Sequence, residues 1–195
     1  MGCDGGTIPK RGELVQKKKK EEKIEKKDSL NTKWRHCAMS QEPLQKPIVA
    51  CELGRLFNKE SIIKYLIDKS SGPSSSRGST FSYIRNLKDL KELKLMKNPA
   101  HKDEVDKIGQ GSKVAEYFCP ISGLEMSGNY KFQYLWSCGC VFSERALKEI
   151  RDGICLQCNA AYTVDDVITL NGSIEETEEL EKRMNERRMK NKRKK

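Results

Sequence analysis

Four cysteines in the second half of the chain stand at the spacing of metal ligands. One residue separates Cys138 from Cys140, and two residues separate Cys155 from Cys158, so the sequence holds two close thiol pairs. A structural zinc ion needs four soft ligands in a tetrahedron, and two short turns that each supply two thiols meet that need. We therefore predict one structural zinc ion at these four residues. The alternative is a set of buried or free thiols.

The wider spacing resembles a RING finger in which half of the ligands are replaced. A RING finger uses eight ligands in cross-braced order, and the four cysteines occupy its third, fourth, seventh and eighth positions. They form one complete site. The other site would consist of Cys119, Ser122, Ser143 and Ala146, and this degenerate set lacks the donors to hold zinc. We expect hydrogen bonds and packing to take the place of that second ion.

The elements around the thiols are short. Residues 130–136 alternate between apolar and polar side chains and predict a strand, residues 143–151 predict a helix between the two cysteine pairs, and residues 164–170 close the unit. A unit of about 55 residues is too small to be stable on its core alone, so zinc is expected to be needed for folding.

The first half of the chain repeats this pattern without thiols for a metal. Cys37 and Ser40 match Cys119 and Ser122 at a shift of 82 positions, and residues 57–62 match 142–147 at a shift of 85. The segment resembles a U-box, the zinc-free relative of the RING finger. Residues 47–51 predict a strand and residues 58–69 an amphipathic helix. The alternative is two unrelated α+β units.

These observations predict an α+β fold made of two tandem RING/U-box-like ββα units. The expected domains are a disordered basic N-terminal tail at 1–28, a zinc-free U-box-like unit at 29–98, a linker at 99–116, a degenerate RING-like unit with one zinc at 117–172, and an exposed helix with a basic tail at 173–195.

The positive charge of the chain lies in its ends. The net charge is +10, of which residues 10–27 contribute +5 and residues 182–195 contribute +8, while residues 28–181 sum to −2. A fold that binds nucleic acid normally carries the positive face itself. We therefore expect only weak, sequence-independent, salt-dependent nucleic-acid binding through the basic tail. That tail comprises Arg187, Arg188, Lys190, Lys192, Arg193, Lys194 and Lys195.

Several classes of protein are not supported by the sequence. No window approaches about 18 consecutive apolar residues, so no membrane span is expected. The first twenty residues lack the apolar core of a secretory signal. The sequence also shows no phosphate-binding loop, no paired carboxylates and no nucleophile–base pair of recognisable spacing, so we expect no hydrolase or kinase activity and no small-molecule substrate.

Longer motifs resemble the replication termination factor 2 family of eukaryotic nuclear proteins. They are MGCDGGTIPKR at the start, PIVACELGRLFNKESI, CGCVFSERALKEI and DDVITLNG. The resemblance implies a nuclear protein on chromatin that acts at stalled or paused replication forks and in the replication-stress response. Its expected partners are replisome or other nuclear proteins. The family has also been linked to pre-mRNA splicing in some lineages, which stays an alternative.

The RING-like pattern further implies a possible E2 conjugating enzyme as a partner, and hence a ubiquitin or SUMO ligase as an alternative to a non-enzymatic docking module. Such ligases act by positioning the charged E2. The last loop departs from the active pattern, because Leu156 and Gln157 leave it without a proline and Asn159 stands where active RING fingers carry arginine. The candidate docking residues are Ile121, Leu147, Ile150, Met39, Ile62 and Tyr65. Ordinary core packing is the alternative role for Ile121, Leu147 and Ile150.

Overall fold

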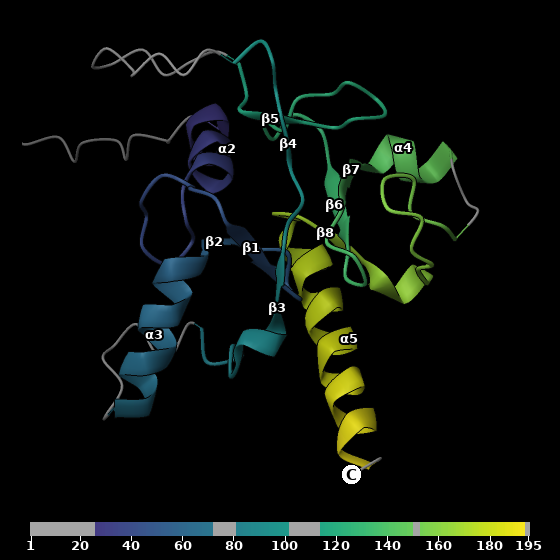
Figure 1. The fold of residues 1–195 in the computed structure, drawn as a ribbon. Coiled ribbons are helices and arrows are strands. Elements are labelled where there is room, and N and C mark those ends of the chain that lie inside the picture. The colour runs from purple at the N-terminus through teal and green to yellow at the C-terminus, as the bar shows by residue number, and fades with distance from the viewer. Residues whose placement is uncertain (1–25, 72–80, 102–113, 150–152, 194–195) are drawn as a thin grey trace, which may run out of the picture.

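The first unit is a three-stranded antiparallel sheet followed by a helix. The computed structural model describes residues 26–71, 81–101, 114–149 and 153–193, and Figure 1 shows their arrangement. In the first unit β1 (Ile48–Cys51) lies between β2 (Leu56–Asn58) and β3 (Leu90–Glu92), and α3 (Lys59–Ser71) follows β2. All four residues of β1 are buried, as expected of a central strand.

The second unit has the same order of elements. Its strands are β6 (Phe132–Leu135) at the centre, β7 (Val141–Ser143) and β8 (Val167–Thr169), and α4 (Glu144–Glu149) follows β7. A short 3-10 helix precedes the last strand of each unit, η2 (Leu87–Asp89) in the first and η3 (Val164–Asp166) in the second. Between the units, β4 (Met96–Lys97) pairs with β5 (Tyr117–Phe118), so the strands on either side of the predicted linker are hydrogen-bonded to each other.

The strand register confirms the predicted repeat. Val49 pairs with Phe57 in the first unit, and Gln133 pairs with Phe142 in the second. The loop that follows the first ligand position also repeats. Gln41 and Gly123 are 82 positions apart and have φ of +60° and +65°. Each donates its N–H, at 3.0 Å, to the carbonyl of the cysteine four residues earlier, Cys37 or Cys119. Chance similarity between unrelated units would not reproduce this backbone.

The two units pack against each other through equivalent turns. Asn171 of the second unit donates its N–H to the carbonyl of Gly54 at 2.9 Å, and Lys94 of the first unit donates to the carbonyl of Gly139 at 2.8 Å. Gly54 and Gly139 are related by the same shift of 85, so the contact is reciprocal, as in a symmetric dimer within one chain. The segment that carries β3 and β4 runs between the units (Figure 1). Buried residues of both units form one core.

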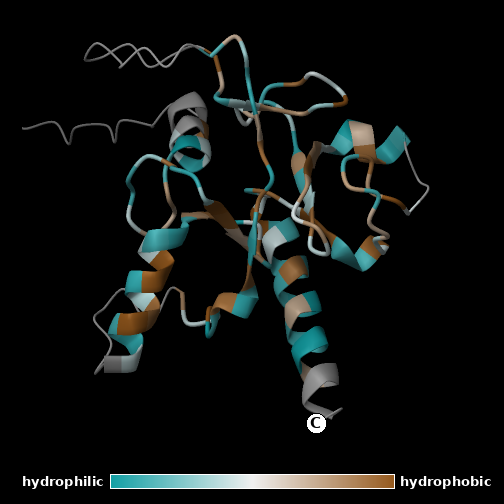
Figure 2. Ribbon diagram, viewed as in Figure 1, coloured by the Kyte–Doolittle hydropathy of each residue, from teal (hydrophilic) through white to brown (hydrophobic). Residues whose placement is uncertain are grey.

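The C-terminal helix α5 (Ile174–Arg193) differs from the predicted exposed helix. Leu180 and Met184 are only 9% and 4% exposed and belong to the core. Figure 2 shows apolar residues alternating with polar ones along this helix. The helix was predicted to be exposed because it contains few apolar residues. Leu180 and Met184, four positions apart, are nevertheless enough to form a narrow buried stripe. A capping box begins the helix, since Ser173 Oγ accepts the Glu176 N–H at 3.3 Å and Glu176 Oε2 accepts the Ser173 N–H at 2.8 Å.

A further helix at the N-terminal side extends the first unit. The helix α2 (Lys26–Arg35) begins inside the segment predicted as a disordered tail at 1–28. Trp34 is 6% exposed, and its ring meets Phe132 of the second unit edge-on at 6.0 Å. Residues 1–25, most of the predicted tail, and 102–113, most of the predicted linker, lie outside the described residues. No described helix is long and apolar enough to cross a membrane.

Candidate metal centre and docking face

The four predicted zinc ligands come together in the structure. The Sγ atoms of Cys138, Cys140, Cys155 and Cys158 all lie within 4.8 Å of one another. The Sγ atoms of Cys140 and Cys158 are 3.7 Å apart. A tetrahedral site with Zn–S bonds of about 2.3 Å has sulfur–sulfur edges of about 3.8 Å. The donor set and its geometry therefore fit a zinc ion.

Two turns position these thiols. Gly139 has φ of +78°, which allows the chain to reverse between Cys138 and Cys140. In the second turn Asn159 donates its N–H to the Cys155 carbonyl at 2.8 Å, and its own φ is +54°. The first turn is closed by the hydrogen bond from the Gly139 N–H to the Leu135 carbonyl at 2.7 Å, so each thiol pair lies within a single hydrogen-bonded turn.

Ionisation of the crowded thiols differs with their surroundings. The backbone N–H of Ala160 lowers the pKa of Cys158 to about 7, whereas burial raises the pKa of Cys138 and of Cys140. Zinc binds thiolates, so metal binding at this cluster displaces protons and is weakened as the pH falls.

Hydrogen bonds occupy the predicted degenerate site. Ser122 and Ser143 share a hydrogen bond of 2.7 Å between their Oγ atoms, and Ala146 donates its N–H to Ser143 Oγ at 3.3 Å. Burial disfavours ionisation of Cys119, but hydrogen bonds led by that from Ser122 outweigh it and lower its pKa. Polar contacts thus connect the four positions in place of an ion.

The first unit has side-chain packing at the place of the metal. Leu53 and Arg55 stand at the positions of Cys138 and Cys140 in the repeat. Leu53 is 6% exposed, and the Arg55 guanidinium lies 5.9 Å from the centre of the Phe81 ring. A shift of 77 positions relates β3 to β8, and the same shift makes Phe81 the equivalent of Cys158 in the repeat. The sequence analysis missed this correspondence because the intervening loops differ in length. A cation–π contact and a leucine replace the ligands here.

The candidate docking residues separate into exposed and buried ones. In the second unit Ile121 is 43% exposed and Leu147 is half-buried, while Ile150 lies outside the described residues. Leu156, in the loop between two metal ligands, is also 43% exposed and was not among the predicted docking residues. An exposed branched side chain on each ligand loop is not explained by core packing.

The first unit offers a poorer docking face. Ile62 is fully buried, so its prediction as a docking residue was wrong, because the periodicity of a helix does not tell which apolar residue faces its own sheet. Tyr65 is half-buried and donates its hydroxyl to the Phe81 carbonyl at 3.3 Å. Lys69 donates to the Ile84 carbonyl at 2.9 Å, so α3 is tied to the facing loop. Met39 is half-buried.

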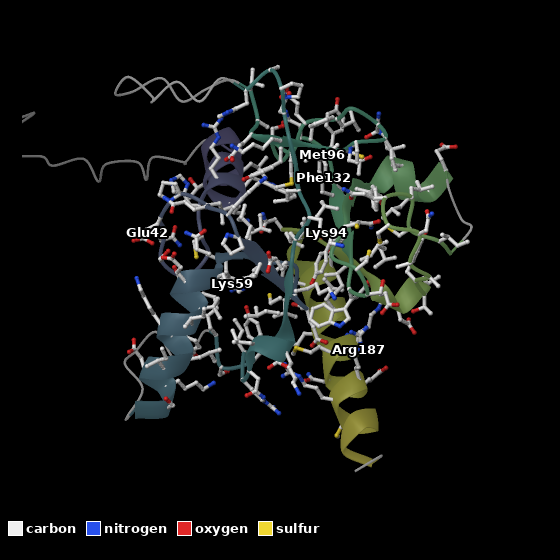
Figure 3. The ribbon with its side chains drawn as sticks, in the orientation of Figure 1. Glu42, Lys59, Lys94, Met96, Phe132 and Arg187 are labelled. Carbon is white, nitrogen blue, oxygen red and sulfur yellow. The ribbon has the colours of Figure 1, made fainter. Side chains whose placement is uncertain are left out.

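Two residues assigned to the basic tail belong to the fold instead. Arg187, labelled beside α5 in Figure 3, donates to Glu52 Oε1 at 3.3 Å and to the Asp165 carbonyl at 3.0 Å. Arg188 donates to the Tyr83 carbonyl at 2.8 Å. Burial raises the pKa of Glu52, although both arginines oppose it. The side chains of Lys190, Lys192, Arg193, Lys194 and Lys195 lie outside the described ones.

Comparisons with known proteins agree with this architecture. The Rtf2 RING-finger family matches residues 1–195. Replication termination factor 2 of Rattus norvegicus and of Homo sapiens are each 50% identical to the chain over 97% of its length, and that of Gallus gallus is 48% identical over 98%. The chain spans 62–63% of these relatives' own lengths. It is therefore a member of the Rtf2 RING-finger family, with a four-cysteine site suited to zinc in its second unit.

Proposed function

We propose that the chain is a nuclear replication-fork factor that acts at stalled or paused forks and in the replication-stress response. The observation that carries this proposal is the 50% identity to replication termination factor 2 over nearly the whole chain. We propose that the two units contribute a docking surface to this activity.

The geometry supports docking rather than chemistry. The two units share one core, and the hydrogen bond between Ser122 and Ser143 fixes the loop that carries the exposed Ile121. A metal ion at the four cysteines would fix the loop that carries the exposed Leu156. Because Leu156 lies between Cys155 and Cys158, the metal would hold its side chain at the surface. Replisome or other nuclear proteins with an apolar contact residue are the proposed partners.

Recovery of the protein with nascent DNA tests this proposal. In cells that express only the tagged chain, we expect several-fold enrichment on nascent DNA after fork stalling with hydroxyurea, compared with mature chromatin. A double variant, Ile121→Ser with Leu156→Ser, should lose most of this enrichment. The matched control is Val164→Ser, which removes an apolar side chain that is 81% exposed outside the ligand loops.

Two outcomes would contradict the proposal. Equal recovery from nascent DNA and mature chromatin would reject a role at forks. Unchanged enrichment of the double variant would reject docking through the ligand loops. Co-purification with spliceosomal proteins in place of replisome proteins would favour the splicing alternative.

A ubiquitin or SUMO ligase is the second candidate, favoured by the exposure of Ile121 on the first ligand loop. Under this proposal the chain accelerates discharge of an E2 thioester by about 10-fold or more, within the range that positioning can supply. Ile121→Ala should abolish the acceleration. Met39→Ala should retain it, because α3 of the first unit is hydrogen-bonded to the facing loop and this unit is the poorer docking face. If the metal-loaded protein accelerates discharge of the thioester from none of a panel of E2 enzymes, this candidate is rejected.

A further inference from the structure

The metal-binding turn of the second unit is held by residues of the first. Lys91 of β3 donates its Nζ hydrogen bond to the carbonyl of Ser137, the residue before the first ligand, at 2.7 Å. Lys94, labelled in Figure 3, donates its backbone N–H to the carbonyl of Gly139 between the first two ligands. The carbonyl of Glu92 packs on Gly139 so closely that an added Cβ would lie 2.2 Å from it.

We propose that the zinc-free unit supplies the outer shell of the metal centre in the other unit, with Lys91 as its positioning residue. Retention of the metal then depends on the contact between the units, and the first unit acts as part of the metal site. This inference is independent of the role at replication forks.

Charge and geometry both favour this role for Lys91. A zinc ion with four thiolates carries a net charge of about −2, which a nearby ammonium group stabilises. The hydrogen bond to Ser137 also fixes the turn that presents Cys138 and Cys140. Among the described residues no carboxylate forms an ion pair with the Lys91 ammonium, and the neighbouring Glu92 pairs with Lys59 at 3.2 Å. Outer-shell groups of this kind commonly change metal affinity 10–100-fold.

The reciprocal contact between the units provides an internal comparison. Gly54 accepts the same backbone hydrogen bond from Asn171, but its turn carries Leu53 and Arg55 where the other turn carries thiols. The counterpart of Lys91, at the shift of 77, is Ile168, which is 3% exposed. Of these two equivalent positions, only the one beside the metal-binding turn carries a lysine that reaches the turn. A purely architectural contact would not need this difference.

The rate of zinc release from the full chain tests the proposal. With zinc-loaded protein and an excess of a chromogenic chelator, we expect Lys91→Met to release zinc at least about 10-fold faster than the wild type. Lys91→Arg should restore slow release, because it keeps the charge and the donor. The matched control is Lys88→Met, which removes an exposed lysine three residues earlier and should leave the rate unchanged.

A second measurement keeps the proposal testable if Lys91→Met fails to fold. Hydrogen exchange on the zinc-loaded wild-type chain should show the Lys94 amide as strongly protected as the amides of the metal-binding turn, because its hydrogen bond to Gly139 belongs to the same contact. Zinc release from folded Lys91→Met at the wild-type rate would overturn the proposal. Fast exchange of the Lys94 amide in the zinc-loaded protein would also overturn it.

Discussion

The variant Gly139→Ala is expected to lose about 2–4 kcal/mol of the free energy of unfolding. The φ of +78° at this residue strains any residue with a Cβ. The new Cβ would in addition lie 2.2 Å from the Glu92 carbonyl oxygen, a backbone atom of the other unit that cannot rotate away. The two units would have to separate locally, with loss of the Lys94–Gly139 hydrogen bond. Urea denaturation monitored by circular dichroism measures the change.

Two glycine variants are matched controls for that prediction. Gly54→Ala should cost a similar amount, because its Cβ would lie 1.9 Å from the Thr169 carbonyl oxygen at the reciprocal contact. Gly123→Ala should cost only about 1 kcal/mol, since its φ of +65° is strained but no atom lies within 4 Å of the new Cβ. Equal losses at Gly123 and Gly139 would show that the close contact between the units contributes nothing to stability.

Loss of the metal is expected to unfold both units, although only one of them holds the ligands. Binding of a structural zinc ion is commonly worth about 10–16 kcal/mol in zinc-finger peptides, which is comparable to or exceeds the total stability of a typical domain. The core is continuous across the units, with Trp34 of the first packed on Phe132 of the second. We therefore expect Cys155→Ser, or chelation of the wild type, to abolish the near-ultraviolet dichroism of the tryptophans in a single transition.

The control for metal loss is Cys119→Ser, a serine at a ligand position of the degenerate site. Cys119 is fully buried beside Ser122 and Ser143, so this change should cost about 1–2 kcal/mol and leave the metal content unaltered. Elemental analysis should find one zinc ion per chain for the wild type and for Cys119→Ser, and none for Cys155→Ser. A folded, cooperative first unit in the metal-free protein would contradict the expectation of one folding body.

Features that depend on neighbouring residues could be predicted from the sequence. The ligands Cys138, Cys140, Cys155 and Cys158 form two pairs within single turns, so spacing alone identifies them. The strand β1, the helix α3 and the capping box of Ser173 follow from periodicity and from side chains three residues apart. The ligand order of a RING finger also predicted that the second metal site would be degenerate, and the shift between the repeats predicted a first unit without thiols for a metal.

Features that depend on contacts between distant segments were decided only by the tertiary structure. Arg187 meets Glu52, 135 residues away, and this contact together with Met184 makes α5 part of the core rather than an exposed helix. The burial of Ile62 and the exposure of Leu156 depend in the same way on which face each element presents to its partners. The reciprocal packing of Gly54 and Gly139 needs both units to be folded, because the steric demand on each glycine comes from a backbone carbonyl of the other unit. Local sequence carries no information on that carbonyl's position.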